Sequence, residues 1–421
     1  MQIFDTAVIG AGAAGLVCAI TAARKGGRPV LLEHMPEPAK KILATGNGRC
    51  NYTNTALDLE NYYCRDKSFV SAVLEQFSCR RTICFFEELG IRPIQKNGTC
   101  IYPESGQASA VRNALLLEAK RLQIPILMPV GIRTVQKAGA GNRGFEILTK
   151  TGTVKCRTCV LAAGGKAAKK TGSDGSGYVY ARQLGHTIIT PLPALGALTA
   201  DYSRWKLPSG IRIACTAYLH IDGECAACEQ GELQITDYGI SGIVVFQFSR
   251  LAARALEEQK QTDVVFDFKP DMDLDELICF LQNRFQSIYH VHKTLWECLS
   301  GFLPDKLIPV ILKRSGADIG QRCKACSLKQ IKRIARQLKQ YQVAVTGTKD
   351  FSSSQATAGG VATAEITAGT MESKIVPGLY FAGEIVDVDA KCGGYNLQWA
   401  WSSGYAAGCA AARRCISGIK S

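Results

Sequence analysis

The first 33 residues constrain the fold of this chain more than any other stretch. An apolar run, Thr6-Ala-Val-Ile, leads into Gly10, Gly12 and Gly15 at G-x-G-x-x-G spacing, with Ala13 and Ala14 between them. A helical run follows, and a second apolar run, 29–32, ends at an acid. This order predicts a βαβ unit in which the glycines allow the tight turn, close approach of the backbone to a pyrophosphate, and close helix–strand packing.

The acid after the second strand indicates which dinucleotide the unit binds. Glu33 stands where a ribose hydroxyl needs an acceptor, and His34 follows it. An acid at this position favours a free ribose 2′-OH, so the sequence predicts FAD or NAD and not NADP. The helix N-terminus would face the phosphate charge. The alternative is a glycine-rich turn in some other α/β protein.

Composition sets the class of protein. A chain of 421 residues is long enough for two or three domains, and 47% hydrophobic with 20% charged residues is typical of globular proteins. Neither an apolar run of 18 residues nor a signal-peptide pattern is present, so neither a membrane span nor secretion is expected. Eighteen cysteines are then expected to be reduced thiols in the cytoplasm.

The net charge of +14 allows an anionic partner: nucleic acid, a membrane surface, or an acidic substrate with an anionic cofactor. Residues 321–340 hold seven Lys or Arg and no acid, with an apolar stripe at helical spacing. We interpret this segment as a surface helix with a solvated face. The alternative is a helix that binds nucleic acid or lipid. Because the segment lacks aromatic residues for base stacking, no nucleic-acid partner is predicted.

Three later segments carry candidate cofactor-binding residues. Loop 40–51 resembles the segment beneath the flavin ring in flavoproteins with two dinucleotide-binding domains. Its candidates are Lys41, Thr45, Gly46, Gly48, Arg49, Cys50 and Asn51. A single cysteine disfavours a flavin–disulfide relay here. A strand predicted at 124–130 ends at Val130, which either offers its backbone to an adenine or is a buried strand residue. A predicted hairpin, 145–160, leads into Ala163, Gly164 and Gly165.

The last fifty residues hold a second glycine-rich constellation. The candidates are Gly383, Glu384, Asp387, Gly394, Asn396 and Leu397, followed by a helix from Trp399 to about Ala411. A glycine-rich turn entering a helix can direct N–H groups at the O2 and N1 edge of a flavin, where the helix dipole stabilises negative charge. The alternative is an ordinary glycine turn that caps a helix.

The chain is predicted to be an α/β protein with a discontinuous Rossmann-like domain. From about residue 191, short alternating segments separated by glycine turns predict an inserted antiparallel β-barrel domain, followed by a helical cap. The predicted ranges are 1–190 and 351–421 for the FAD-binding domain, 191–270 for the β domain, 271–340 for the helical cap and 341–350 for the return strand of the insert. Helices are also predicted at 68–90 and 109–122.

Taken together, these motifs resemble one bacterial flavoprotein family. They are I-G-A-G-A-A-G, A-T-G-N-G-R-C-N at 44–51, A-A-G-G, M-E-S-K-x-V-P-G-L-Y-F-A-G-E at 371–384 and G-G-Y-N-L-Q at 393–398. Members are aminoacetone-oxidase-like FAD-binding enzymes or BaiN-type NAD(P)/FAD-dependent oxidoreductases. The resemblance implies FAD, an inserted barrel, a helical cap, and an activity on unsaturated 3-oxo bile-acid intermediates.

Three C-x-x-C pairs, at 156/159, 225/228 and 323/326, raise the alternative of a structural zinc. Because the first pair is predicted in a strand and the others lie apart, scattered thiols are the preferred interpretation and no metal is predicted. No second G-x-G-x-x-G with its strand and acid occurs, so NAD(P)H is expected to visit the flavin transiently and leave before the second substrate binds.

The expected activity is hydride transfer from NAD(P)H through flavin N5 to the β carbon of a conjugated enone, in a small hydrophobic and acidic substrate. A small-amine oxidase and a flavin-bearing RNA-modifying protein are the alternatives. The sequence singles out no proton donor and leaves the oligomeric state open.

Overall fold

The structure is a computed structural model that describes residues 3–139, 144–201 and 207–417. The ends of the predicted ranges at 1–2 and 418–421, and residues 202–206 of the predicted β domain, lie outside the described residues. The chain forms two compact units: unit 1 is Met1–Leu192 with Ser354–Ser421, and unit 2 is Pro193–Ser353. The two segments of unit 1 share one hydrophobic core, whereas unit 2 has a core of its own.

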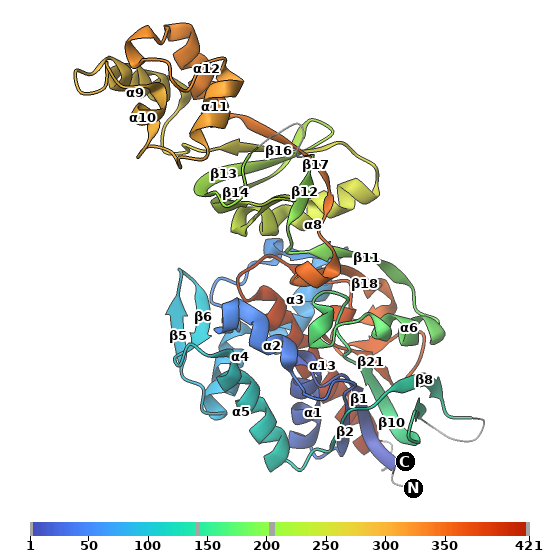
Figure 1. Cartoon of the computed structure of the whole chain (residues 1–421). Coiled ribbons are helices and arrows are strands. Elements are labelled where there is room, and N and C mark those ends of the chain that lie inside the picture. The colour runs from blue at the N-terminus through green and yellow to red at the C-terminus, as the bar shows by residue number, and fades with distance from the viewer. Residues whose placement is uncertain (1–2, 140–143, 202–206, 418–421) are drawn as a thin grey trace. The chain divides into compact units, whose positions relative to one another are not determined.

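The main sheet of unit 1 is built on parallel strands (Figure 1). Its order is β21-β10-β1-β2-β7, and each neighbouring pair is parallel. The bounds are β1 Ile3–Ile9, β2 Pro29–Leu32, β7 Ile126–Leu127, β10 Thr153–Leu161 and β21 Leu379–Phe381. Thr6 to Ile9 and all of β2 are buried, as expected for parallel strands covered on both faces.

Shorter strands extend this sheet and form small sheets beside it. Antiparallel additions to the main sheet are β8 Ile132–Lys137, β9 Phe145–Thr149, β19 Ile366–Thr367 and β20 Glu372–Ser373. Two small sheets pair β11 Ile188–Ala194 with β18 Ala356–Val361 and β4 Tyr62–Tyr63 with β22 Asp389–Ala390. A third has the order β3-β6-β5, with bounds β3 Thr53–Asn54, β6 Cys100–Pro103 and β5 Pro93–Lys96. The helices include α2 Lys40–Ala44, α5 Ala108–Arg121 and α6 Ser176–Gln183.

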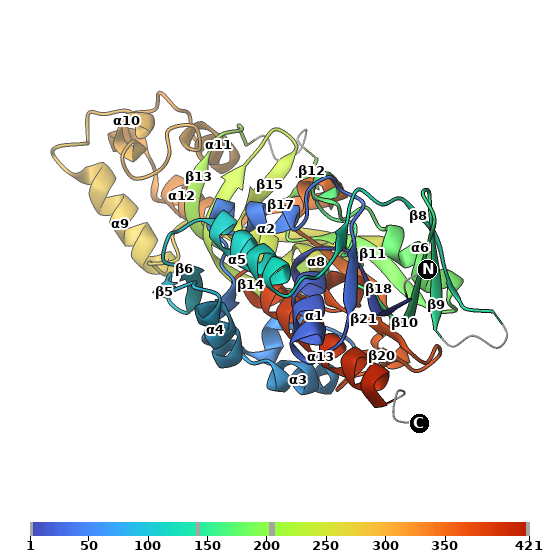
Figure 2. The same cartoon turned by 90° about the horizontal axis from the view of Figure 1, so that it is seen from below.

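Helices α1 (Ala13–Arg24) and α13 (Tyr395–Ser417) lie side by side in unit 1 (Figures 1 and 2). Glycines on α13 permit this approach. A Cβ added at Gly404 would lie 2.4 Å from the carbonyl oxygen of Ala14, and one at Gly408 would lie 2.4 Å from that of Cys18. The first and last segments of the chain are therefore packed backbone against backbone.

The single helix predicted at 68–90 is wrong, because the structure has two: α3 (Lys67–Gln76) and α4 (Cys79–Glu88). The chain leaves the helical region at Phe77, whose φ is −141° and ψ 72°. The carbonyl oxygen freed at Phe77 accepts hydrogen bonds from Gln398 Nε2 at 2.8 Å and Ser402 Oγ at 2.7 Å. Side chains of α13 therefore hold the break.

The strand predicted at 124–130 is also shorter than expected. Only Ile126–Leu127 pairs as a strand, and Pro129 follows with no N–H to continue the ladder. The chain returns at Val130, whose N–H donates to the carbonyl oxygen of Glu33 at 2.7 Å.

Unit 2 is built on a closed antiparallel barrel, as the sequence predicts. Its six strands follow the order β12-β15-β14-β13-β16-β17, and β12 pairs with β17 to close it. The bounds are β12 Leu198–Ala200, β13 Arg212–Ile221, β14 Glu224–Ile235, β15 Gly239–Gly242, β16 Thr262–Asp267 and β17 Tyr341–Thr348, with α8 at Ile243–Glu257. Alternating residues of β13, such as Cys215, Ala217 and Leu219, are buried.

Four helices follow β16 within unit 2 and form a group of their own (Figure 1). They are α9 Leu274–Gln286, α10 Leu295–Leu299, α11 Ile308–Ser315 and α12 Leu328–Lys339. Capping boxes begin α9, α10 and α12, at Asp273, Thr294 and Ser327. The predicted fold class, a Rossmann-like domain with an inserted barrel and helices, is confirmed. None of the helices among the described residues is long and apolar enough to cross a membrane.

Candidate dinucleotide-binding site

Most of the predicted site residues of unit 1 follow the carboxyl ends of four adjacent parallel strands. Gly10, Glu33, Ala163 and Gly383 come directly or almost directly after β1, β2, β10 and β21. Because the strands are parallel and neighbouring, these residues gather at one edge of the sheet. This is the edge at which open α/β sheets bind ligands.

Glycine occupies the three positions of the motif for different reasons. Gly10 has φ +104°, and a Cβ there would lie 2.5 Å from the carbonyl oxygen of Ala162; at Gly15 it would lie 1.9 Å from that of Gly10. Folding therefore requires both. Gly12 has φ −81° and no atom within 4 Å of an added Cβ. The protein itself gives no reason for glycine at this position, whereas a phosphate placed against the N-terminus of α1 does.

Glu33 holds the turn that faces the glycine motif. One carboxylate oxygen accepts from the N–H of Ala11 and the other from that of Met35, each at 2.8 Å. Exposed His34 lies beside it, with Nδ1 at 3.4 Å from Glu33 Oε1. The carboxylate is buried yet still has acceptor capacity, because each oxygen has two lone pairs.

A second carboxylate ties four segments together at the same edge. Glu384 Oε2 lies 2.7 Å from Nζ of Lys41 and accepts from the N–H of Gly165 at 3.2 Å, while Oε1 accepts from the N–H of Thr357 at 2.9 Å. Gly164 lies in the same cluster, since a Cβ there would lie 3.9 Å from Glu384 Oε2. Loop 40–51, the end of β10, β18 and the turn after β21 are therefore fixed to one another.

Loop 40–51 turns back on itself before it reaches the start of α13. Gly46 and Asn47 have left-handed φ values, and the N–H groups of Arg49 and Cys50 donate to the carbonyl oxygens of Gly46 and Thr45. Gly48 and Arg49 are exposed.

Asn51 brings this loop to α13. A Cβ added at Gly394 would lie 2.9 Å from Asn51 Oδ1, so the two segments touch. Asn51 Oδ1 is buried and accepts no hydrogen bond from the described residues. An unsatisfied buried acceptor beside a helix N-terminus, whose first N–H groups also lack intrahelical partners, fits a ligand that offers both donors and acceptors.

Cys50, the thiol of loop 40–51, is a poor nucleophile. Desolvation by burial raises the pKa of Cys50 to about 12. All eighteen cysteines lie among the described residues, and none of them forms a disulfide. Within the described ranges, no group of three or more His, Cys, Asp or Glu side chains could hold a metal ion.

We therefore expect Cys50→Ala to leave reduction of a bound flavin unchanged within about twofold, because a protonated buried thiol is a poor electron relay. The wild-type thiol should also resist iodoacetamide at pH 8 under native conditions, measured by mass spectrometry of the peptide. Rapid alkylation of Cys50 with concurrent loss of activity would contradict this.

Three further predicted residues have structural partners. Asn396 exchanges hydrogen bonds with both backbone groups of Ala390, which clamps the turn before α13. The N–H of Asp387 donates to the carbonyl oxygen of Val361, and Leu397 packs against the core. The N–H of Val130 is engaged by Glu33, as described above, and does not remain for an adenine.

Sequence reasoning missed the residues that set the position of Gly383. Its N–H donates to Ser403 Oγ at 2.9 Å, and its carbonyl oxygen accepts from Trp399 Nε1 at 3.1 Å. Thr357 Oγ1 likewise accepts from the N–H groups of Lys166 and Ala167. The spacing of small residues along the predicted last helix is a signal of close packing, but no sequence signal marks Thr357.

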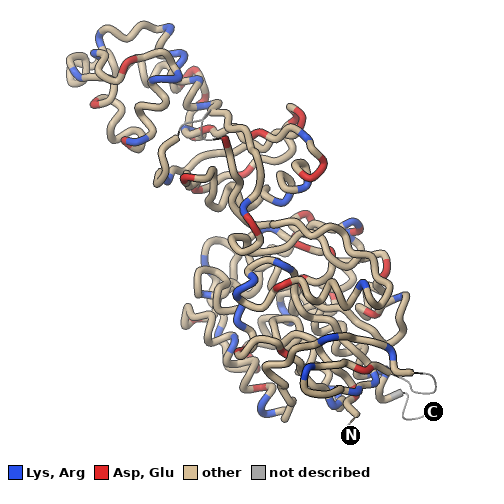
Figure 3. The backbone as a smooth tube through the Cα atoms, turned by 45° about the vertical axis from the view of Figure 1, so that its right-hand side comes forward, with Lys and Arg blue, Asp and Glu red and all other residues tan. Residues whose placement is uncertain are grey.

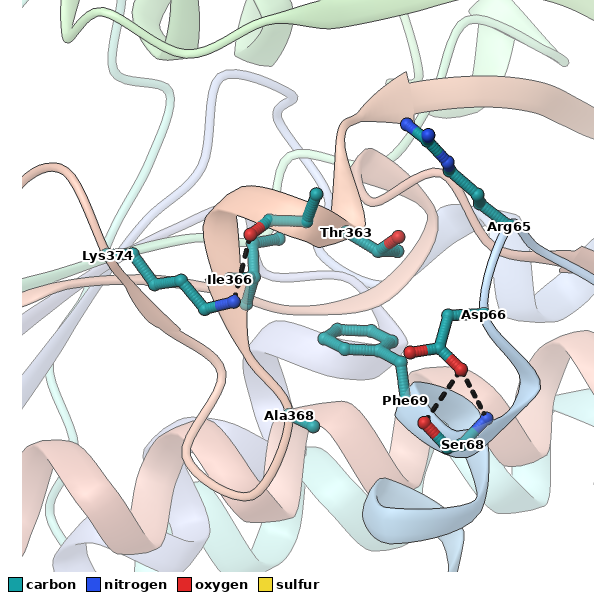
Figure 4. Close-up of a pocket in the computed structure, with 9 residues that line it drawn as sticks. Arg65, Asp66, Ser68, Phe69, Thr363, Ile366, Ala368 and Lys374 are labelled. Atoms are coloured by element: carbon teal, nitrogen blue, oxygen red, sulfur yellow. Dashed lines mark hydrogen bonds between the residues drawn. The ribbon is translucent and has the colours of Figure 1, made fainter.

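A cavity of about 380 Å³ lies in unit 1 (Figure 4). It is lined by Arg65, Asp66, Ser68, Phe69, Thr363, Ala364, Ile366, Ala368 and Lys374. None of these belongs to the predicted site. The ring centroid of Phe69 lies 6.0 Å from that of Trp399, so one residue that lines the cavity packs near the indole that holds Gly383. Asp66 and Lys374 are already bonded locally, to Ser68 and to the carbonyl oxygen of Ala364.

Comparison with known proteins places this geometry in context. The profile of a family described as "HI0933-like protein Rossmann domain" matches residues 4–410. The 3-dehydro-bile acid delta(4,6)-reductase of Clostridium scindens is 40% identical over 411 residues, 97% of this chain and 98% of that protein. The ribosomal RNA dihydrouridine synthases of Escherichia coli and Haemophilus influenzae are 29% and 30% identical, each over 96% of this chain and 97% and 98% of their own.

Among solved structures, 3-ketosteroid delta1-dehydrogenase from Sterolibacterium denitrificans, in complex with 1,4-androstadiene-3,17-dione, matches with a TM-score of 0.53. The match covers 98% of this chain and all of that one at 12% identity. At this identity the likeness concerns the fold alone.

Proposed function

The chain belongs to the HI0933-like Rossmann-domain family, and on that premise we propose that it is an FAD-dependent reductase of a carbon–carbon double bond conjugated to a carbonyl group. The observation that carries the proposal is the 40% identity with a bile-acid delta(4,6)-reductase along almost the full length of both chains. The family match, over residues 4–410, spans every candidate site residue, from Gly10 to Leu397.

The residues at the sheet edge fit FAD. The pyrophosphate would lie against the N-terminus of α1 at Gly12, with the adenosine ribose beside Glu33. The flavin end would lie between loop 45–51 and the start of α13, where Asn51 Oδ1 has acceptor capacity to spare and Gly394 leaves the backbone open. Glu384 and Lys41 would hold the segments around it in place.

When bound, FAD supplies hydride transfer at N5, which reduces the β carbon of an enone while a proton is added at the α carbon. The protein residues bind and orient it. The N-terminal dipole of α13 favours negative charge near Asn396 and Leu397, and the buried packing of Trp399 and Ser403 fixes Gly383. The electron donor proposed is NADH or NADPH, which binds transiently because only the G-x-G-x-x-G motif at Gly10 to Gly15 is followed by a helical run, a second strand and an acid.

A steroid acid is the substrate class we propose. The relative's name denotes a 3-oxo bile acid with double bonds at C4 and C6, and the net charge of +14 favours an anionic ligand. The cytoplasm is the proposed location, in keeping with eighteen cysteines of which none forms a disulfide.

The experiment is to incubate the FAD-loaded protein with NADH or NADPH and a 3-oxo-4-ene bile acid, and to follow the product by mass spectrometry. We expect a product heavier by two hydrogens, with one deuterium transferred from NAD(P)D. Turnover of NAD(P)H with hydrogen peroxide as the only product would instead indicate an oxidase.

A uracil base in RNA is the second candidate substrate. Two relatives are named as ribosomal RNA dihydrouridine synthases, and each aligns over 96% of this chain. Uracil C5=C6 is also conjugated to a carbonyl, so the same chemistry would serve both substrates. Formation of dihydrouridine in ribosomal RNA from a deletion strain, restored by purified protein, would favour this candidate over the steroid.

We expect Glu33→Ala to weaken FAD binding by about 1.5–3 kcal/mol, the range for hydrogen bonds to a charged group. The dissociation constant of the apoprotein for FAD, from quenching of flavin fluorescence, measures it. Glu33→Gln is the matched control, because it keeps the size and an acceptor and should lose less. Equal FAD affinity in all three proteins would place the ribose elsewhere.

A further inference from the structure

The helical part of unit 2 carries a row of cations on one face of α12. Lys329, Lys332, Arg333 and Arg336 follow i, i+3, i+4, i+7 spacing, and all four are exposed. We call these four residues the basic face. The opposite face of the helix is buried in the core of unit 2: Ile331, Ile334, Ala335 and Leu338. The helix is therefore anchored, with its cations directed to solvent.

The basic face is not neutralised by the protein. No ion pair between described residues involves any of its four members, and α12 contains no acid. The last cation of the helix behaves differently: Lys339 Nζ lies 2.6 Å from Asp267 Oδ2 and also donates to the carbonyl oxygen of Lys269. Cations needed for folding are thus paired in this region, and those of the basic face are not.

The structure supplies the aromatic side chain that α12 lacks. Tyr289 follows α9 and is 77% exposed, next to Ile288, which is 80% exposed. The loop after Tyr289 is bonded to the segment before α12, since the N–H of Lys324 donates to the carbonyl oxygen of Val291 at 3.2 Å and that of Cys323 to Lys293 at 2.9 Å. A solvent-facing aromatic ring is therefore attached to the segment that leads into the basic face.

Further cations lie where the loop after Tyr289 meets the segment before α12. Lys293, Arg322 and Lys324 are exposed at this junction, and Arg322 Nη1 donates to the carbonyl oxygen of His292. In Figure 3, Lys and Arg recur along these helices. The surface thus combines a row of fixed positive charges with an exposed aromatic ring, the two elements that proteins use to bind single-stranded nucleic acid.

We propose that this surface, formed by the basic face together with Tyr289 and its neighbouring cations, binds RNA. The cations contact phosphates and the ring of Tyr289 stacks on a base. An anionic membrane fits less well, because a helix that lies in a lipid interface must insert its apolar face, and that of α12 is buried in protein. The names of two full-length relatives specify RNA. The inference does not rest on the proposed reaction, since binding is measured without turnover.

The first test is the salt dependence of RNA binding by the full FAD-loaded protein. The probe is a labelled single-stranded RNA of about twenty nucleotides and mixed sequence, followed by fluorescence anisotropy. We expect Lys329→Gln, Lys332→Gln, Arg333→Gln and Arg336→Gln, combined, to lower the slope of log Kobs against log salt by about 3, at roughly 0.7 per phosphate contact. Glutamine keeps helix propensity close to that of Lys and Arg.

The matched control removes the same charge from unit 1. Lys96 on β5, Lys120 on α5, and Arg133 and Lys137 on β8 are exposed, and their combined change to Gln should leave the slope unchanged. An equal fall in slope in both variants would show that net charge alone attracts RNA and would overturn the proposal.

Tyr289 gives an independent readout. Tyr289→Ala should weaken RNA binding by between about fivefold and a hundredfold with an unchanged salt slope, and Tyr289→Phe should restore it, because stacking needs the ring and not the hydroxyl. Vesicles of phosphatidylcholine with phosphatidylglycerol are the competing probe. If the quadruple basic-face variant loses vesicle binding but keeps its RNA affinity and slope, the surface belongs to a membrane and the proposal is wrong.

Discussion

Gly12→Val should yield a folded protein that does not retain FAD. A Cβ added at Gly12 meets no protein atom within 4 Å, and φ of −81° is ordinary for valine. The loss at this helix N-cap is therefore small, about 1 kcal/mol. The same side chain would occupy the space of the pyrophosphate and remove about two charge-assisted hydrogen bonds, worth roughly 3–6 kcal/mol together. Flavin absorbance per protein and FAD titration of the apoprotein measure the loss.

The control is thermal unfolding of the wild-type and Gly12→Val apoproteins, followed by circular dichroism. Their unfolding midpoints should nearly coincide. Gly15→Ala provides the contrast, because its Cβ would lie 1.9 Å from the carbonyl oxygen of Gly10 and should damage the fold itself. Full flavin occupancy in Gly12→Val would remove the pyrophosphate from the N-terminus of α1 and with it the assigned site.

Gly404→Val should destabilise unit 1 by about 3 kcal/mol or more. A Cβ at this position would lie 2.4 Å from the carbonyl oxygen of Ala14, so α1 and α13 could not keep their distance. The gain in helix propensity of valine over glycine, about 0.5 kcal/mol, is too small to offset this. Urea unfolding followed by tryptophan fluorescence measures the effect, since Trp399 and Trp401 both lie on α13.

Gly139→Val is the matched control. Gly139 has no atom within 4 Å of an added Cβ and lies in the same unit, so its midpoint in urea should stay within about 0.5 kcal/mol of wild type. A Gly404→Val midpoint no lower than that of the control would mean that the two helices pack more loosely than the structure has them.

The parts of the fold that the sequence predicts correctly depend on local patterns. The βαβ unit is predicted because the glycine motif, the helical run and the second strand all lie within the first 33 residues, and the barrel because short alternating segments from about residue 191 are separated by glycine turns. The gathering of site segments at one sheet edge then follows from parallel strand order. These features need no knowledge of distant contacts.

The features that the sequence does not predict depend on partners far along the chain. The break at Phe77 is held by Gln398 and Ser402, more than three hundred residues away. The apolar pattern of residues 68–90 alone predicts one continuous helix. Likewise, Tyr289 joins the basic face only through backbone bonds between its loop and residues 322–324. The prediction of no nucleic-acid partner rests on the composition of residues 321–340 alone, whereas the RNA-binding surface proposed here also includes Tyr289.

The most direct measurement of the central claim is an anaerobic mixing experiment. The bound flavin is first reduced with one equivalent of NADH or NADPH, and a 3-oxo-4-ene bile acid is then added in the absence of oxygen. The proposed function predicts that the absorbance of oxidised flavin returns as saturated product forms, mole for mole. A flavin that stays reduced until oxygen is admitted, at a rate independent of the enone, would contradict it.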